Sequence, residues 1–176
     1  MPAQLLPYPK QRSFPNIHSR NHFVTSEETV GKKVLYNCVG WAALADTKKW
    51  WQPGSAPDHY WPNGILDDES LVSYEQLFES FGYQRCNTDR LEIRFEKVAL
   101  YADADGFTHV AYQLFFGWTS KLGNWEDIRH RTLSALEGGN YGRVTTIMKR
   151  TSGIRGYLAR TCFNLTARLW PLRRPA

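Results

Sequence analysis

The sequence predicts an α+β fold in which a cysteine-bearing helix packs on a small antiparallel sheet of three to five strands. The run Asn37 to Leu44 changes from β-branched to helix-forming residues, so a helix is expected to open at Cys38. Residues 94–116 contain two β-prone stretches around a polar, glycine-containing turn, which is typical of a β-hairpin. Residues 153–170 carry an apolar stripe at helical spacing and predict a C-terminal amphipathic helix.

The N-terminal third shows an arm, a short helix and a loop. Prolines interrupt residues 1–24 and predict an extended arm. Residues 34–36 are expected either to form a short strand or to lead directly into the first helix, which Asn37 is expected to cap and which is expected to end near Lys48. Residues 50–64 are rich in tryptophan, proline and glycine and predict a loop.

A second helix is predicted to start at Ser73, because Ser73 and Gln76 form a capping-box pattern, and to stop at Gly82. In the hairpin that follows, Asp103 to Gly106 form the turn. Residues 118–121 are expected to continue as a third strand.

The last part of the domain is predicted to contain one more helix and one more strand. Asn124 is expected to cap a helix that runs to about Leu136, since Glu126 and Asp127 fall in its first turn, where the helix dipole favours acids. Residues 143–148 are expected to form the last strand.

Length and composition indicate one domain with two appendages. We divide the 176 residues into the arm at 1–24, the α+β domain at 25–150 and a basic C-terminal helix or tail at 151–176. The sequence contains no apolar run long enough to span a membrane and no signal-peptide pattern at its start. The three cysteines are few and widely spaced, which suits a reducing compartment. We therefore expect a cytoplasmic protein, with export by a dedicated secretion system left open.

The basic residues in excess lie at the C-terminal end. Seven of the 22 basic residues follow residue 148, where no acidic residue occurs, and the remaining 15 are opposed by all 17 acidic residues. Residues 1–148 therefore carry about −2. The tail could bind nucleic acid, lie on an anionic membrane surface, or pack its apolar stripe on the domain. The last is the default for a helix with one apolar side.

The chemistry of the chain centres on Cys38 and His109. A thiol at a helix N-terminus can have a lowered pKa, because the helix dipole stabilises the thiolate. His109 shares a strand face with Ala111 and Gln113, opposite the apolar face of that strand, and is therefore available as a base. The alternative is structural: cysteine is commonly buried, and a histidine in a strand is often only a satisfied polar group.

A helix-opening cysteine followed by a Thr-His-Val-Ala strand resembles the papain-like thiol hydrolases, in particular the NlpC/P60 and CHAP peptidases and amidases. Cys38 and His109 stand at the positions that match the catalytic cysteine and histidine of those families. The chain also resembles a small uncharacterised bacterial family with an early Cys-x-x-Trp-Ala and a late Trp-Thr-Ser-Lys-Leu-Gly motif, which stands here at Trp118 to Gly123. The resemblance spans about residues 34–150 and implies a papain-like fold.

The resemblance implies a third, orienting residue on the strand after the histidine. Ser120 fits by position, while Asp127 fits by chemistry, since a carboxylate orients an imidazole and stabilises its charged form. An acid in the first turn of a helix, however, usually serves the helix cap. The families' glutamine before the cysteine is missing, and the backbone N–H of Cys38 could serve in its place as the oxyanion donor.

Flat aromatic side chains gather beside Cys38 and are suited to a sugar- or peptide-binding cleft, or alternatively to a core beneath a long loop. We assign substrate binding to four residues: Trp41, Trp61, Gln113 and Trp118. No cysteine or histidine cluster with ligand spacing accompanies Asp127 and His130, so neither a metal nor another cofactor is expected.

These observations predict a cysteine hydrolase that cleaves an amide or isopeptide bond in a peptide, peptidoglycan-peptide or protein substrate. A Cys–His deamidase or transglutaminase would share the thioester intermediate and differ in the acceptor. The non-enzymatic alternative is an intracellular interaction protein whose basic C-terminal helix binds a partner, RNA or a membrane surface.

Overall fold

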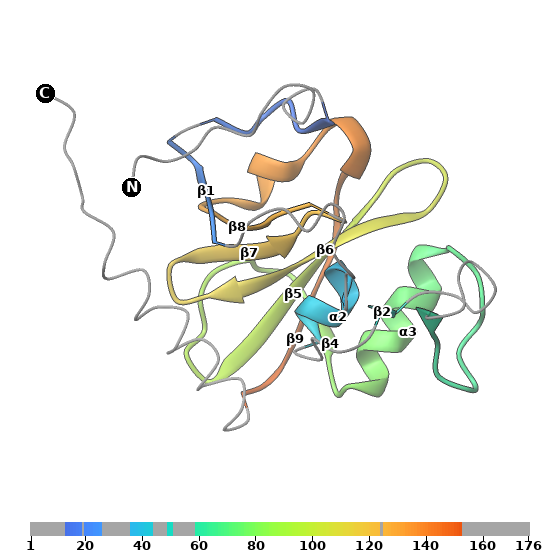
Figure 1. Cartoon of the computed structure of the whole chain (residues 1–176). Coiled ribbons are helices and arrows are strands. Elements are labelled where there is room, and N and C mark those ends of the chain that lie inside the picture. The colour runs from blue at the N-terminus through green and yellow to red at the C-terminus, as the bar shows by residue number, and fades with distance from the viewer. Residues whose placement is uncertain are drawn as a thin grey trace, which may run out of the picture.

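The computed structural model describes residues 13–18, 20–25, 36–43, 49–50, 59–123 and 125–152. Its main feature is a seven-stranded sheet in the order β1-β8-β7-β6-β5-β9-β4, in which every neighbouring pair is antiparallel (Figure 1). The strands, in chain order, are β1 His22–Val24, β4 Gln84–Cys86, β5 Phe95–Ala102, β6 Phe107–Leu114, β7 Gly117–Lys121, β8 Asp127–His130 and β9 Arg143–Thr151. A separate parallel pair joins β2 (Lys49–Trp50) to β3 (His59–Tyr60).

The two faces of the sheet carry different cores. One face packs against α2 (Cys38–Ala42) and α3 (Leu71–Ser80), with Val98, Leu100 and Val110 among the sheet residues of that cluster. The opposite face packs against the 3-10 helix η1 (Leu133–Leu136) and the segment before β1. Because side chains alternate along a strand, neighbours on β5 and β6 point into different cores.

The hairpin predicted for residues 94–116 is present. Strands β5 and β6 pair antiparallel, and the N–H of Asp103 donates to the carbonyl of Gly106 at 3.0 Å to close the turn. Gly106 has φ of +135°, and a Cβ there would lie 2.5 Å from the carbonyl oxygen of Glu69. The turn therefore needs glycine for both its backbone conformation and its close packing. The third strand predicted at 118–121 corresponds to β7.

The papain-like fold class is wrong. The structure is dominated by an antiparallel sheet of seven strands, rather than by a cysteine-bearing helix on a sheet of three to five strands. The α-helices whose bounds are described are α2 and α3, and α2 covers only part of one face. The predicted C-terminal amphipathic helix, the helix extension to Lys48 and most of the short strand at 34–36 lie outside the described residues.

The helix predicted from Asn124 to Leu136 is also wrong. Residues Asp127–His130 form β8, and only Leu133–Leu136 are helical, as the 3-10 helix η1. Strand β8 bonds to β7 on one side and to β1 on the other. Pairing on both edges outweighs a local helix preference, because both sets of backbone groups are satisfied by neighbouring strands.

The helix predicted from Ser73 starts earlier, at Leu71. Ser70 is the N-cap, and its hydroxyl accepts a hydrogen bond from the N–H of Ser73 at 3.2 Å. Ser73 instead lies in the first turn, where its own hydroxyl donates to Asp68. The helix ends at Ser80, close to the predicted stop at Gly82.

The segment expected as an extended arm contributes to the core where it is described. Phe14 and Ile17 are buried against the η1 face, and β1 adds a strand at the edge of the sheet. Among the described residues, no helix is long and apolar enough to cross a membrane.

Candidate functional site

Cys38 is the first residue of α2, as the sequence predicts. Asn37 is the N-cap, has an extended backbone, and accepts the N–H of Gly40 on its side-chain oxygen at 3.0 Å. This bond satisfies one of the N–H groups that the first turn of a helix leaves unpaired. The thiol therefore lies at a fixed position at the start of the helix.

The Cys38 thiol is buried and protonated at neutral pH. Burial raises its pKa to about 11, and this effect outweighs backbone groups of Val110, Val39 and Cys38 that lower it. A buried thiolate loses solvation, and a few N–H groups compensate for only part of that loss. The lowered pKa expected from the helix dipole is therefore not what this environment produces.

Cys38 lies where β7 separates from β6. Strand β6 pairs with β5 from Phe107 onward, whereas its pairs with β7 run from Tyr112 to Leu114. Helix α2 packs on both β6 and β7. The sulfur thus faces the backbone of Val110, the residue that follows His109.

His109 is fully buried on β6 between two tyrosines. Its ring stacks parallel on Tyr141, with centroids 4.1 Å apart, and lies 5.5 Å from the ring of Tyr101. Neither ring nitrogen has a hydrogen-bond partner in the described part of the chain. Burial, with a smaller contribution from the nearby charge of His130, holds the pKa of His109 well below 6.5. The imidazole is therefore neutral at pH 7.

Tyr141 connects the two predicted catalytic residues. Its ring covers His109, and its pKa is raised first by burial and then by the proximity of Cys38. Tyr141 is thus close to both groups, but the thiol belongs to the core on the α2 face, whereas the imidazole of His109 points to the opposite face of β6. The resting structure has no hydrogen bond between Cys38 and His109.

Ser120 and Asp127, the predicted orienting residues, contact other groups. Ser120 Oγ lies 3.0 Å from His130 Nε2, and His130 Nδ1 donates to the carbonyl of Thr132 at 2.8 Å. Because Nδ1 donates, Nε2 accepts the hydroxyl proton of Ser120. Neither residue hydrogen-bonds to His109, whose ring nitrogens have no partner in the described chain.

Asp127 stabilises the region in front of α2. Its carboxylate accepts the hydroxyl of Tyr36 at 2.8 Å and lies 3.4 Å from the ammonium of Lys121. Both Asp127 and Lys121 are almost fully buried. The carboxylate is thus engaged in an ion pair and a hydrogen bond that hold neighbouring strands.

Trp41 is the half-exposed member of the four predicted substrate-binding residues. Its indole N–H donates to Thr119 Oγ1 at 3.3 Å, and its ring stacks on Tyr36 at 5.6 Å. It lies on the same short helix as Cys38. Of the four, Trp41 is therefore best placed to meet a molecule that approaches the thiol.

The other three predicted substrate-binding residues are buried. Trp61 packs edge-on against Tyr74, and Trp118 belongs to the core cluster on the η1 face. Gln113 is 3% exposed and donates from Nε2 to the carbonyl of Asp89. Their placement matches the alternative interpretation, in which the aromatic residues form core.

Sequence reasoning missed Tyr141, although a signal for it exists. Three glycines at 138, 139 and 142 surround it, and all three have positive φ. A Cβ on Gly142 would collide with the carbonyl of Ala102, so this loop lies tightly against the end of β5. A dense set of glycines beside an aromatic residue indicates such a close backbone approach.

The described residues contain no group of three or more histidine, cysteine, aspartate or glutamate side chains that could hold a metal ion. Residues 24–149 match the model of a family described as a domain of unknown function, DUF7689, and the chain belongs to this family. No curated protein and no solved structure matches the chain.

Proposed function

We propose that this member of the DUF7689 family is a cysteine hydrolase that cleaves an amide or isopeptide bond, with Cys38 as nucleophile and His109 as base. The observation that carries the proposal is the neutral imidazole of His109, whose two ring nitrogens have no partner in the described chain. It lies on β6 next to the residue that faces the thiol. A buried imidazole without a hydrogen-bond partner is costly, and such groups often serve function.

In each half of the proposed reaction, His109 takes up one proton and gives it back. His109 takes the thiol proton as the sulfur attacks the carbonyl carbon, and the N–H groups at the start of α2 face the oxyanion that forms. The amine leaves with the proton that His109 had taken, and a thioester remains on Cys38. Water, deprotonated by His109, then releases the acid and restores the thiol.

The raised pKa of the thiol defines how the nucleophile forms. At neutral pH a stable thiolate–imidazolium pair is absent, because both groups are neutral. The thiolate must therefore form during attack, by direct transfer to His109. This requires a Cys38–His109 hydrogen bond in the substrate complex, so the imidazole must turn from the opposite face of β6 toward the thiol when the substrate binds.

The test is the pH profile of Cys38 alkylation by iodoacetamide, measured by peptide mass spectrometry. With His109 as base, the rate is expected to stay level between about pH 7 and pH 9, because His109 is neutral throughout. Replacing His109 with glutamine should lower the rate at pH 7 by about 100-fold and make it rise about tenfold per pH unit toward the thiol pKa of about 11.

Two controls belong to the same experiment. Cys86, which is half-buried, reports on general reagent access, and the variant His59→Gln removes a histidine outside the site. Alkylation of Cys38 that rises steadily with pH and is unchanged in His109→Gln would mean that the thiol is only a buried structural group.

An acyl-transfer assay separates hydrolysis from the other Cys–His reactions. Reaction with p-nitrophenyl acetate should leave an acetyl group on Cys38 that water removes. If glycine hydroxamate or another amine takes the acetyl group far faster than water, the activity is transfer, as in a transglutaminase. The proposal places the enzyme in the cytoplasm, where the free thiols of Cys38 and Cys86 stay reduced.

The non-enzymatic alternative rests on the basic tail at 151–176, of which residues beyond 152 lie outside the described structure. Among the described residues, none of the contacts around Cys38 favours a binding protein over the proposed hydrolase.

A further inference from the structure

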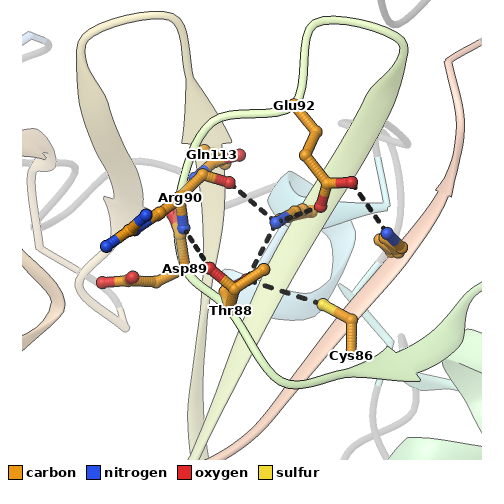
Figure 2. A network of polar contacts seen from close by, with 8 residues as sticks. Cys86, Thr88, Asp89, Arg90, Glu92 and Gln113 are labelled. Carbon is orange, nitrogen blue, oxygen red and sulfur yellow. Dashed lines mark hydrogen bonds and ion pairs between the residues drawn. The ribbon is translucent and has the colours of Figure 1, made fainter.

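Three large apolar side chains are exposed on two neighbouring loops. Phe116, in the β6–β7 turn, is 83% exposed, while Ile93 and Leu91, in the loop between β4 and β5, are 68% and 41% exposed. Gln113, near the end of β6, donates to the carbonyl of Asp89 and so joins the two loops (Figure 2). We call Leu91, Ile93 and Phe116 the apolar tip surface.

The exposure of Leu91 and Ile93 is fixed by the fold. The fully buried ammonium of Lys97 donates to the carbonyls of Thr88 and Arg90 at 2.8 and 2.7 Å and pairs with Glu92 at 2.6 Å. Figure 2 labels these three partners but not Lys97 itself. Because Glu92 is turned toward Lys97, the residues on either side of it point outward. The loop is therefore anchored through Lys97, with its apolar side chains in solvent.

The charge around the apolar tip surface is positive. Arg90 and Arg94 are exposed beside it, whereas the carboxylate of Glu92 is neutralised by both Lys97 and Lys149. The remaining nearby acid is Asp89. An anionic partner would therefore meet, next to apolar side chains, guanidinium groups that form no ion pair with the described residues.

The basic tail starts at the same place. The N–H of Ser152 donates to the carbonyl of Arg94 at 2.7 Å, so the chain leaves the described fold next to Ile93. The segment that follows, 153–176, contains no acidic residue. Its basic residues are Arg155, Arg160, Arg168, Arg173 and Arg174.

We propose that the apolar tip surface docks on an anionic lipid membrane, with Phe116, Ile93 and Leu91 entering the interface and the flanking Arg90 and Arg94 binding lipid phosphates. Stable attachment at a membrane surface generally takes two signals, and apolar insertion combined with the flanking positive charge supplies both. A specific protein partner would need about 800 Å² of complementary surface on each side, far more than three side chains on two loops supply. The proposal is independent of the chemistry of Cys38.

The test is co-sedimentation of the full chain with vesicles of phosphatidylcholine alone or with about one third phosphatidylglycerol. Binding is expected to the anionic vesicles and to fall in high salt. Phe116→Ser and Ile93→Ser should each weaken binding about five- to tenfold, since each removes one inserted side chain. Val72→Ser is the matched control, because Val72 is 52% exposed on α3.

The outcomes divide clearly. Loss of binding in the two tip variants with wild-type binding by Val72→Ser supports the proposal, and unchanged thermal unfolding shows that these exposed positions do not alter the fold. Three results would overturn it: no binding to anionic vesicles, binding that is unchanged in both tip variants, or self-association of the chain that the tip variants abolish. If Cys38 is alkylated at the wild-type rate in the tip variants, loss of membrane binding does not result from a change in the proposed active site.

Discussion

Between about pH 7.5 and pH 5 the free energy of unfolding is expected to fall by about 4 kcal/mol, because His109 and His130 stay neutral in the folded protein. Burial is the first cause that lowers both pKa values, to about 4 for His130 and well below 6.5 for His109. In the unfolded chain each would take up a proton near pH 6.5. A neutral buried histidine therefore costs about 2 kcal/mol at pH 5.

The sign follows from proton uptake. Below pH 6.5 the unfolded state binds more protons than the folded state, so stability is complete above that pH and decreases as the pH falls toward the folded pKa. His22 adds to the same trend, since burial also lowers its pKa. Carboxylates such as Glu92, whose pKa its two lysine partners lower, titrate mainly below this range.

Urea unfolding followed by tryptophan fluorescence at several pH values measures this effect. The variant His130→Gln should flatten the pH dependence by about 2 kcal/mol, even though losing the contacts to Ser120 and Thr132 lowers stability at every pH. His59→Gln should leave the slope unchanged. An equal slope in His130→Gln and wild type would show that His130 is not held neutral.

Features that depend on neighbouring residues in the chain could be predicted from the sequence. Asn37 caps the helix at Cys38 through a bond to Gly40, and the turn at Asp103 to Gly106 closes the hairpin. Both depend on contacts only a few residues apart. In such cases the side-chain chemistry of one short segment decides the backbone conformation.

Strand β8 could not be predicted in this way. The acids Glu126 and Asp127 favour a helix start here, yet the strand residues pair with Ser120 on one side and with His22 on the other. These partners are identified only by the folded topology. A local helix signal of a few tenths of a kcal/mol is weaker than two complete sets of strand hydrogen bonds.

In the candidate site, too, the residue types could be predicted from the sequence, whereas their environment could not. The residue types of Cys38 and His109 pointed to a thiol and a base, but the protonation of the thiol depends on how deeply it is buried. Tyr141 and His130 reach His109 from distant parts of the chain. The sequence therefore indicated which groups could react, whereas their electrostatics and their separation are set by packing.

Replacing Lys97 with methionine is expected to lower the free energy of unfolding by about 3 kcal/mol. The ammonium is fully buried and donates two charge-assisted hydrogen bonds, to the carbonyls of Thr88 and Arg90, in addition to its ion pair with Glu92. Hydrogen bonds to charged groups contribute about 1.5–3 kcal/mol each, and part of the loss is recovered because water can reach the freed loop carbonyls.

Lys149→Met provides the matched control. Lys149 pairs with the same carboxylate at 2.8 Å but is 29% exposed. Loss of such a partly exposed ion pair costs about 0–1 kcal/mol, and Glu92 keeps Lys97 as its partner. The difference in the free energy of unfolding between the two variants therefore measures the hydrogen bonds to the two loop carbonyls, which Lys97 makes and Lys149 does not.

Urea unfolding gives the two free energies, and hydrogen exchange locates the loss. In Lys97→Met the amides of Arg90 and Phe95, which bond to Thr88 and Glu92, should exchange faster than those of the β5–β6 hairpin. Equal destabilisation by the two variants would mean that the ion pair with Glu92, and not the anchoring of the loop, is what Lys97 contributes. The exposed positions of Leu91 and Ile93 would then not depend on the hydrogen bonds from the Lys97 ammonium to the loop carbonyls.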